Sequence, residues 1–427
     1  MSRRPPRPPA LRYRPARRTD VDNLAELGLR AYRVSSIEAR RDFYTEHPRF
    51  SIRDVRVGEL DGELVSSLVL LPLHAWVRGH RLPVTGIGSV AVSPEARRRG
   101  VAEATLRATL REMRQRGDAM CLLYAFRSDF YRRYGWSLVE RTSMYSLSPA
   151  QLPASDEARR VRKALVADRP VVQELYEQHA AHAGHFALAR RPEWWEKRLW
   201  NYEGDWVVYE GKRRGQIEGY LQYQVDSGEG PWKLVLTVNE FVASTPAAHR
   251  GLWGYLHSLR DQAVEVVLAA PGDELWPMVV ADAQNLRGEL KLGVQRTTGH
   301  LGYGAMLRLV DVKAALEALP VSPHARGEVT LDVRDDVLPQ NARAWRVSAR
   351  DGRLSVKPEP AARAGGRTRS LPRLTTPVDA LASIAAGSLS PLLAAEAGLV
   401  EDARGAAELI EPWFRSRPAY LFPMNGF

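Results

Sequence analysis

Apolar residues, chiefly Val and Leu, are frequent along segments 55–60 and 63–71, and both segments read as strands. Between the two segments, Asp61 and Gly62 supply the positive backbone angles that a tight hairpin turn requires. A second hairpin is predicted around Gly79. The early part of the chain therefore contains an antiparallel sheet.

After residue 100 the apolar residues recur with a period of about 3.6. Ala102, Leu106, Leu110 and Met113 form a stripe at helical spacing, and Gly117 ends the predicted helix. A strand over 120–126 follows. Strands and helices mixed in this order indicate an α+β (mixed α/β) fold.

A short basic turn joins the apolar strand to this helix and is the first candidate for chemistry. A helix N-terminus presents unpaired N–H groups and a partial positive charge, and a glycine there lets the main chain approach an anion. The turn therefore predicts a binding site for a phosphorylated cofactor. The residues expected at this site are Val90, Ala91, Val92, Arg97, Arg98, Arg99, Gly100, Val101 and Ala102.

A competing cofactor signal lies just upstream, where residues 86–91 read G-x-G-x-x-A. In a dinucleotide-binding fold these glycines follow a strand and open a helix. Here the chain continues through Val90 and Val92, which favour strands, and stops at Pro94. The pattern is therefore not interpreted as a dinucleotide site.

The chain has 427 residues, a net charge of +11 and 44% hydrophobic residues, which is typical of a multidomain globular protein. It has one cysteine, Cys121, so it can form no intramolecular disulfide. Neither a run of 18 apolar residues nor a signal peptide is present, and we expect a cytoplasmic protein without a membrane span. Residues 1–10 are rich in Pro and Arg and read as a flexible basic arm.

Three folded units are expected, over 11–152, 153–303 and 304–427. The second repeats the order strand, Ser/Thr-Pro, basic turn, glycine, helix at 239–253, but bulky Trp253 stands where the first copy has Ala102. We interpret it as a duplicated unit that has lost its cofactor. The third predicts an α+β unit, with helices and strands around a Pro/Gly/Arg-rich loop over 358–373.

The pattern Arg97-x-x-Gly100-x-Ala102 after a Val-Ala-Val strand resembles the acetyl-CoA-binding motif of the GCN5-related N-acetyltransferases (GNAT). The third unit looks like a sterol carrier protein domain (SCP2-like). Together with the segment 130–136 and terminal Phe427, this organisation resembles the Eis (enhanced intracellular survival) family. The resemblance implies two tandem GNAT folds, the second degenerate, transfer of acetyl from acetyl-CoA to amines of aminoglycosides or lysine, and a hexamer.

The resemblance also implies two catalytic groups. Tyr131 would be the general acid that protonates the leaving thiolate, and the terminal carboxylate of Phe427 would be the general base. Independently of the family, residues 419–427 carry no charged side chain, so this segment can dock into the protein. An anchored tail without a catalytic role is the alternative for Phe427.

Other functions are weighed against acetyl transfer. His179, His182 and His185 resemble a metal-binding run, but no nearby thiol or carboxylate completes it, and no metal is expected. A lipid carrier with a vestigial enzyme unit is one alternative, and a nucleic-acid-binding protein using the +11 charge is another. The intact first motif favours the enzyme, with a small-molecule or peptide amine as substrate and no nucleic acid.

Overall fold

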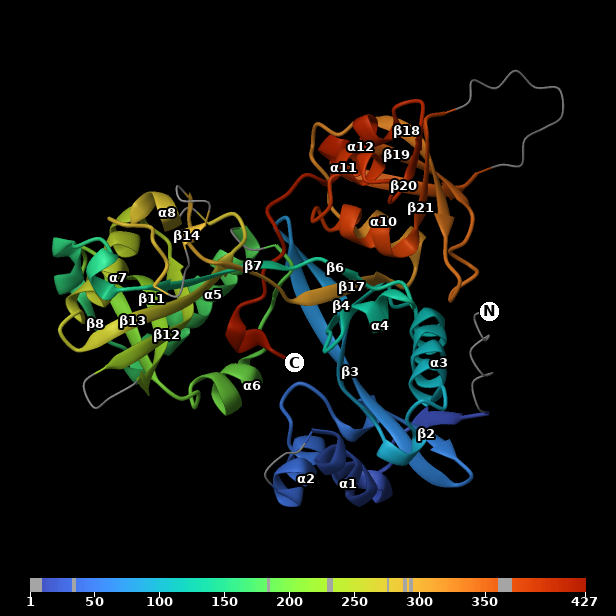
Figure 1. Ribbon diagram of the computed structural model, residues 1–427, viewed down its shortest axis with the longest axis horizontal. Helices are drawn as coiled ribbons and strands as arrows, with labels where there is room; N and C mark the ends of the chain where they lie inside the picture. Colours follow the sequence, from blue (N-terminus) through green and yellow to red (C-terminus); the bar gives the residue numbers. More distant parts are fainter. Residues whose placement is uncertain are drawn as a thin grey trace.

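The computed structural model describes residues 10–32, 36–182, 185–228, 233–274, 276–286, 290–291, 295–359 and 371–427. Three lobes are visible in Figure 1: the first unit in blue and cyan, the second in green and yellow, and the third in orange and red. Most of the predicted basic arm and of the predicted 358–373 loop lies outside the described residues. The mixed α/β architecture expected from the sequence is confirmed.

The first lobe is built on an eight-stranded sheet, in which β9 is added to the side of β3. Both predicted hairpins are present, with positive φ at Asp61 and Gly62 in one turn and at Arg78 and Gly79 in the other. In sheet order the strands are β1 (Arg12–Pro15), β2 (Val55–Leu60), β3 (Glu63–Val77), β4 (His80–Val92), β5 (Met120–Tyr124), β17 (Ala305–Leu309) and β6 (Ser137–Leu138), with β9 (Ala187–Leu188). The helices are α1 (Val21–Tyr32), α2 (Ile37–Thr45), α3 (Val101–Arg116) and α4 (Ser128–Arg132).

The second lobe has a seven-stranded sheet and repeats the strand, helix, strand order of the first. In sheet order the strands are β16 (His300–Tyr303), β7 (Arg141–Leu147), β13 (Ala263–Pro271), β12 (Leu234–Ala243), β11 (Ile217–Ser227), β10 (Asp205–Glu210) and β8 (Val161–Lys163). The helices are α5 (Arg169–His182), α6 (Pro192–Trp194), α7 (Pro246–Ser258) and α8 (Trp276–Val279), and β14 (Leu290–Lys291) pairs with β15 (Gln295–Arg296).

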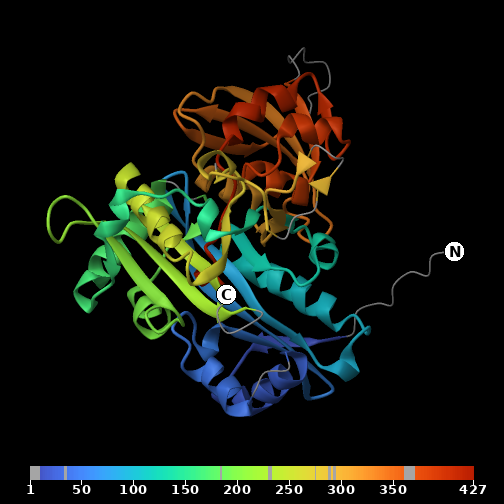
Figure 2. The ribbon, with the colours of Figure 1, turned by 60° about the vertical axis from the view of Figure 1, so that its left-hand side comes forward.

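The third lobe is a five-stranded sheet covered by helices (Figure 2). Its strands in sheet order are β20 (Arg353–Pro358), β19 (Ala344–Arg350), β18 (Gly327–Arg334), β21 (Arg373–Pro377) and β22 (Glu401–Ala403). Its helices are α9 (Val312–Ala318), α10 (Val378–Ala385), α11 (Pro391–Glu396) and α12 (Ala406–Phe414). The sequence predicts helices over 311–319, 377–386, 391–397 and 403–414 and strands over 328–333, 344–349 and 354–356, which correspond to the four helices and to β18, β19 and β20. It does not predict β21 and β22.

The first two sheets exchange strands at a crossing beside Glu140. The chain leaves β6, passes Glu140 and enters β7 of the second sheet, then returns through Gly304 from β16 to β17 of the first. The buried Glu140 carboxylate accepts a hydrogen bond from the Ala305 N–H at 2.7 Å. A Cβ on Gly304 would collide with the same carboxylate, so a glycine is needed there. The domain boundaries expected at residues 152 and 303 remain predictions from the sequence.

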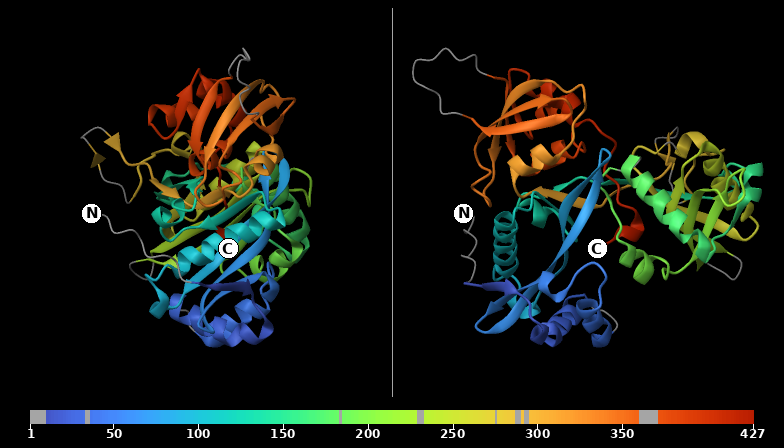
Figure 3. Two further views of the ribbon diagram at one scale, coloured as in Figure 1. Left: turned by 90° about the vertical axis from the view of Figure 1, so that its right-hand side faces the viewer. Right: turned by 180° about the vertical axis from the view of Figure 1, so that it is seen from behind.

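The C-terminal segment runs from the third lobe back between the other two, so that the end of the chain lies beside the first sheet (Figures 1 and 3). Tyr420, Phe422 and Met424 are buried in a cluster formed mainly by the second lobe. This cluster also takes in Trp194 and Trp195, which are buried within it. The predicted docking of the tail is therefore present.

Candidate functional site

The central feature of the first lobe is a separation of two parallel strands. β4 pairs with β5 from Thr85 to Ile87, and beyond that point no pairing joins them in the described residues. A bulge at Ser89, where φ is 51°, shifts the register of β4 against β3. A bulge leaves main-chain groups outside the ladder and turns the strand. The end of β4 can therefore offer backbone hydrogen bonds to a ligand between the strands.

The predicted turn and helix N-terminus follow directly. Gly100 is the N-cap of α3 with φ of 80°, and no side chain caps the first N–H groups of this helix. Those groups and the helix dipole favour an anion at this end. The side chains of Arg97, Arg98 and Arg99 are exposed around it.

A cavity of about 700 Å³ occupies the space between the separated strands. Of the nine residues predicted to hold the cofactor, Val90, Ala91, Val92, Arg97 and Ala102 line it. Arg98 and Arg99 are exposed beside the turn, Gly100 caps the helix, and Val101 is buried beneath it. Ser89, which the family resemblance also places beside the thioester, lines the cavity as well. Sequence reasoning missed the other wall residues, which are Ala31, Tyr32, Ile87, Gly88, Tyr124, Phe126 and Phe130.

Tyr131 lines the same cavity from α4 and is 2% exposed. Its ring contacts Phe130 and Trp136 edge-on, which fixes its orientation. Burial raises the pKa of its hydroxyl, so that the hydroxyl keeps its proton at neutral pH. Among the described residues the hydroxyl makes no hydrogen bond and is available to a ligand.

Phe427 also lines this cavity. Its ring centroid lies 5.2 Å from that of Tyr124. A Cβ placed on Gly86 would lie 3.0 Å from the Phe427 ring, and one placed on Gly88 would lie 3.5 Å from the Phe427 carboxyl carbon. Gly86 and Gly88, the two glycines of the rejected dinucleotide pattern, therefore lie inside β4, and their lack of side chains leaves space for Phe427.

A second cavity, of about 470 Å³, lies on the other side of the C-terminal residue. The two cavities share Tyr124 and Phe427 in their walls. Among the described residues, Glu140 is the one acidic side chain in the wall of the second cavity, and burial raises its pKa to about 7. The neutral residues of this wall are Thr142, Met144, Ala269, Gly302, Tyr303, Gly304, Tyr420, Leu421, Pro423 and Gly426.

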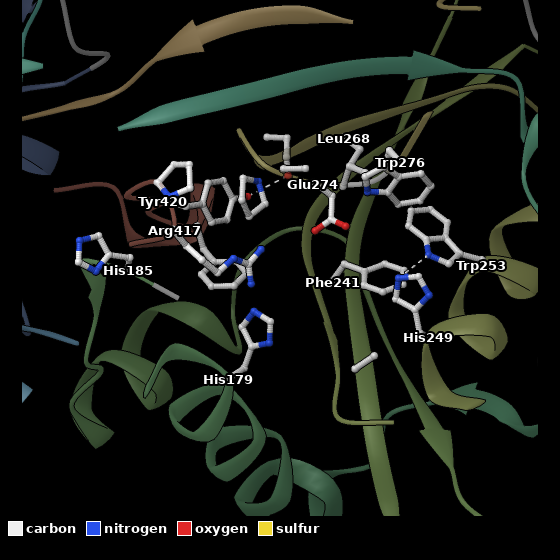
Figure 4. A pocket seen from close by; sticks show the side chains of 16 residues that line it. His179, His185, Phe241, His249, Trp253, Leu268, Glu274, Trp276, Arg417 and Tyr420 are labelled. Atoms are coloured by element: carbon white, nitrogen blue, oxygen red, sulfur yellow. Dashed lines mark hydrogen bonds between the residues drawn. The ribbon is translucent and has the colours of Figure 1, made fainter. Parts of the chain in front are cut away.

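The second lobe has the same strand separation, but it is nearly filled. β12 pairs in parallel with β13 only as far as Val238. Beyond it, Phe241 stacks on Trp253, whose ring centroid is 3.3 Å from that of Trp276. Figure 4 shows these rings on one side of the remaining space and Tyr420 with Arg417 on the other. The cavity that is left measures about 120 Å³.

The histidine run does not form a metal site in the described residues, where no group of three His, Cys, Asp or Glu side chains could hold a metal ion. His182 contacts the carbonyl of Gln178, and His185 contacts that of Ala386. His179 lies in the wall of the small second-lobe cavity, and burial lowers its pKa to about 4. None of the helices described is long and apolar enough to cross a bilayer.

Family models match all three lobes. Residues 12–139 and 187–309 each match an acetyltransferase (GNAT) domain, and residues 312–422 match a sterol carrier protein domain. An uncharacterized N-acetyltransferase of Streptomyces coelicolor is 27% identical over 319 residues, or 69% of this chain and 72% of the relative. The N-acetyltransferase Eis of Mycobacterium tuberculosis is 27% identical over 293 residues, or 64% of this chain and 67% of the relative.

Solved structures share the fold over the whole chain. A GCN5-related N-acetyltransferase from Anabaena variabilis superimposes with a TM-score of 0.82 at 19% identity, covering 98% of this chain and all of that one. Eis1 from Mycobacterium abscessus gives a TM-score of 0.75 at 21% identity, again over 98% of this chain and all of that one. At such identities the likeness shows the fold.

Proposed function

Because the chain belongs to the Eis-like N-acetyltransferases, with two GNAT domains and a sterol carrier protein domain, we propose that it moves an acetyl group from acetyl-CoA to a primary amine in the first-lobe cavity. The observation that carries the proposal is the wall of this cavity, in which Tyr131, Phe427 and the first turn of α3 come together. A proton donor, a carboxylate and an anion site are the three things that this reaction requires.

Acetyl-CoA would lie along the separated end of β4. Its pyrophosphate would meet the N–H groups at the start of α3, with Arg97, Arg98 and Arg99 adding positive charge. Val90 and Val92 would pair their main chains with the pantetheine arm, since in the described residues the edge of β4 that faces β5 is unpaired beyond Ile87. Gly100 and Val101 shape the turn, and Ala102 leaves space for the phosphates.

The amine would reach the thioester from the side of Phe427. A primary amine with a pKa near 10.4 is neutral in only about one molecule in 2,500 at pH 7, so a base must accept its proton. The Phe427 carboxylate would accept it, directly or through a water, as the nitrogen bonds to the carbonyl carbon. The C–S bond then breaks, and Tyr131 donates its proton to the departing thiolate.

The second cavity supports a more specific acceptor. Among the described residues, Glu140 is the one side-chain carboxylate that its wall offers besides the terminal carboxylate of Phe427, and both Glu140 oxygens already accept the N–H groups of Ala305 and Leu421. An aminoglycoside carries several positive charges. Each of them loses hydration on entering the cavity, and this free-energy cost is offset only where the protein supplies a negative partner. We therefore rank a singly charged amine on an apolar or aromatic carrier, or a lysine side chain, above an aminoglycoside.

The test is release of free thiol from acetyl-CoA in the presence of matched amines: an arylalkylamine, a lysine peptide and an aminoglycoside. The proposal expects turnover with at least one of them, which a single alanine added after Phe427 abolishes. Turnover that is unchanged by the added alanine would eliminate the terminal carboxylate as base. A chain that binds coenzyme A but acetylates none of the amines would contradict the proposed reaction.

A cytoplasmic location remains a prediction from the sequence, and a hexamer remains a prediction from the resemblance. The lipid-carrier alternative draws no support from the third lobe, whose sheet and helices enclose a core of their own side chains, including Val329, Val347, Ile384 and Ile410.

We propose a structural role for the third lobe. Its Asp335 forms a buried ion pair with Arg308 of β17, a strand of the first lobe. A Cβ on Gly135 would lie 2.8 Å from the same guanidinium, so the third lobe supports the loop that follows Tyr131.

A further inference from the structure

The C-terminal segment occupies the strand separation of the second lobe before its last residue enters that of the first. The Tyr420 hydroxyl donates to the carbonyl of Ala269 on β13 at 2.8 Å, beyond the last pair that joins β13 to β12. Tyr420 and Phe422 line the small cavity that remains there (Figure 4). The space that holds a cofactor in an active copy therefore holds the protein's own tail in this one.

Asn425 is the most constrained residue of the tail. It is fully buried, and both ends of its side-chain amide are bonded to the second lobe. Its Oδ1 accepts from Arg190 Nε at 2.8 Å, and its Nδ2 donates to the Tyr176 hydroxyl at 2.8 Å. The Tyr176 hydroxyl donates its own proton to the carbonyl of Leu188 at 2.6 Å, so the orientation of the amide is fixed.

A buried ion pair stands behind this amide. The side chains of Arg190 and Glu240 are 1% and 0% exposed, and their charges are paired with each other. The Tyr220 hydroxyl also donates to Glu240 at 2.9 Å. Buried charges with such complete hydrogen bonding have one defined arrangement, because moving either partner leaves the other unpaired.

The main chain of the tail is held from the opposite side. Arg49 of the first lobe donates to the carbonyls of Asn425 and Gly426, at 3.1 and 2.9 Å. Only Gly426 lies between Asn425 and Phe427, so little freedom remains between the anchored amide and the terminal carboxylate.

From this network we infer that the second GNAT domain acts as the receptor that positions the catalytic carboxylate, with Asn425 as the positioning residue. This inference rests on the proposed role of Phe427. The inference gives the degenerate GNAT domain a function in the reaction. The space where a cofactor would bind in an active copy binds the tail instead, and the Arg190–Glu240 pair fixes Asn425 and thereby the position of the Phe427 carboxylate.

The test compares the full chain with Asn425→Leu, which has nearly the same size but cannot form the two hydrogen bonds. We expect kcat to fall by about tenfold to a hundredfold, because displacing a reacting group by about 1 Å has effects of this size. The KM for acetyl-CoA and the affinity for coenzyme A should stay within about twofold, since the amide lies outside the cofactor cavity. Asn425→Asp keeps an acceptor for Arg190 and should recover most of kcat.

Asn285→Leu is the matched control. Asn285 is 1% exposed, its Oδ1 accepts from the Ser146 N–H at 2.7 Å, and it lines neither of the two cavities that share Phe427. Each variant is assayed below its melting temperature. The inference is overturned if Asn425→Leu keeps kcat within twofold, or if Asn285→Leu loses kcat equally.

The added alanine after Phe427 separates the two ideas. If that extension abolishes turnover while Asn425→Leu does not, the terminal base stands and the positioning network is wrong. If the extension leaves turnover intact, the base itself is wrong, and the positioning inference falls with it.

Discussion

Gly86 lies in the middle of β4, under the ring of Phe427, and a single methyl group there would disturb the terminal residue. A Cβ at this position would lie 2.7 Å from Leu73 Cδ1 and 3.0 Å from Phe427 Cε2. Ordinary carbon contacts begin at about 3.5 Å, so the ring must retreat by about 0.5 Å. The Gly86→Ala variant therefore displaces Phe427 and its carboxylate, while the substituted residue itself does not line the cofactor cavity.

The size of the effect follows from this displacement. If about 1 Å costs a hundredfold in rate, about 0.5 Å costs on the order of tenfold, or about 1.4 kcal/mol in the activation barrier. Overpacking against Leu73 adds about 1 to 3 kcal/mol of lost folding stability. We expect kcat to fall about tenfold while the dissociation constant of coenzyme A, measured by calorimetry, changes by less than about twofold.

Gly58→Ala is the control for overpacking. Gly58 is a buried glycine of β2, and its Cβ would meet Ser66 Oγ at 2.3 Å and Leu11 Cδ2 at 2.7 Å. Both variants are compared at a temperature where both are folded. The reasoning is refuted if folded Gly86→Ala turns over as fast as the parent, or if Gly58→Ala slows turnover equally.

Three other outcomes follow from the structure. Tyr131→Phe should lower kcat by about a hundredfold or more and leave coenzyme A binding unchanged; equal turnover would exclude the tyrosine as the acid. Burial raises the pKa of Glu140 from 4.5 to about 7, so its stability contribution is present below pH 4.5 and lost as the pH rises through 7. Urea unfolding at several pH values should therefore show the parent losing on the order of 3 kcal/mol relative to Glu140→Gln, and parallel curves would contradict this. Asp335→Asn leaves Arg308 buried without its counter-charge and should cost about 3 kcal/mol of unfolding free energy, whereas a loss below about 1 kcal/mol would argue against a structural ion pair.

Features set by neighbours in sequence could be predicted. The Asp61-Gly62 turn, the α3 stripe and the glycine at its start depend on residues within one or two turns of each other, and all are present. The same holds for the filled second copy, where Trp253 indeed occupies the space that Ala102 leaves open. Local patterns are sufficient for these features because their physical cause is local.

The exchange of β7 and β17 between the sheets could not be predicted in this way. Strand pairing over more than a hundred residues is decided by packing, and nothing in the apolar pattern of β17 distinguishes one sheet from the other. The buried pair Arg190–Glu240 was missed for a related reason, because charged residues read as surface residues until their partners are known. The apolar tail predicted that Phe427 docks, but its receptor includes Tyr176, which lies 249 positions before its partner Asn425.

The central claim is that the first separated strand pair binds the cofactor and the second has become a holder for the tail. Calorimetric titration of coenzyme A into the parent and into Ala102→Trp, which copies Trp253 into the first lobe, tests it directly. The account predicts one coenzyme A bound per chain of the parent and none bound by the variant. No binding to the parent, two molecules per chain, or unchanged binding to Ala102→Trp would contradict it.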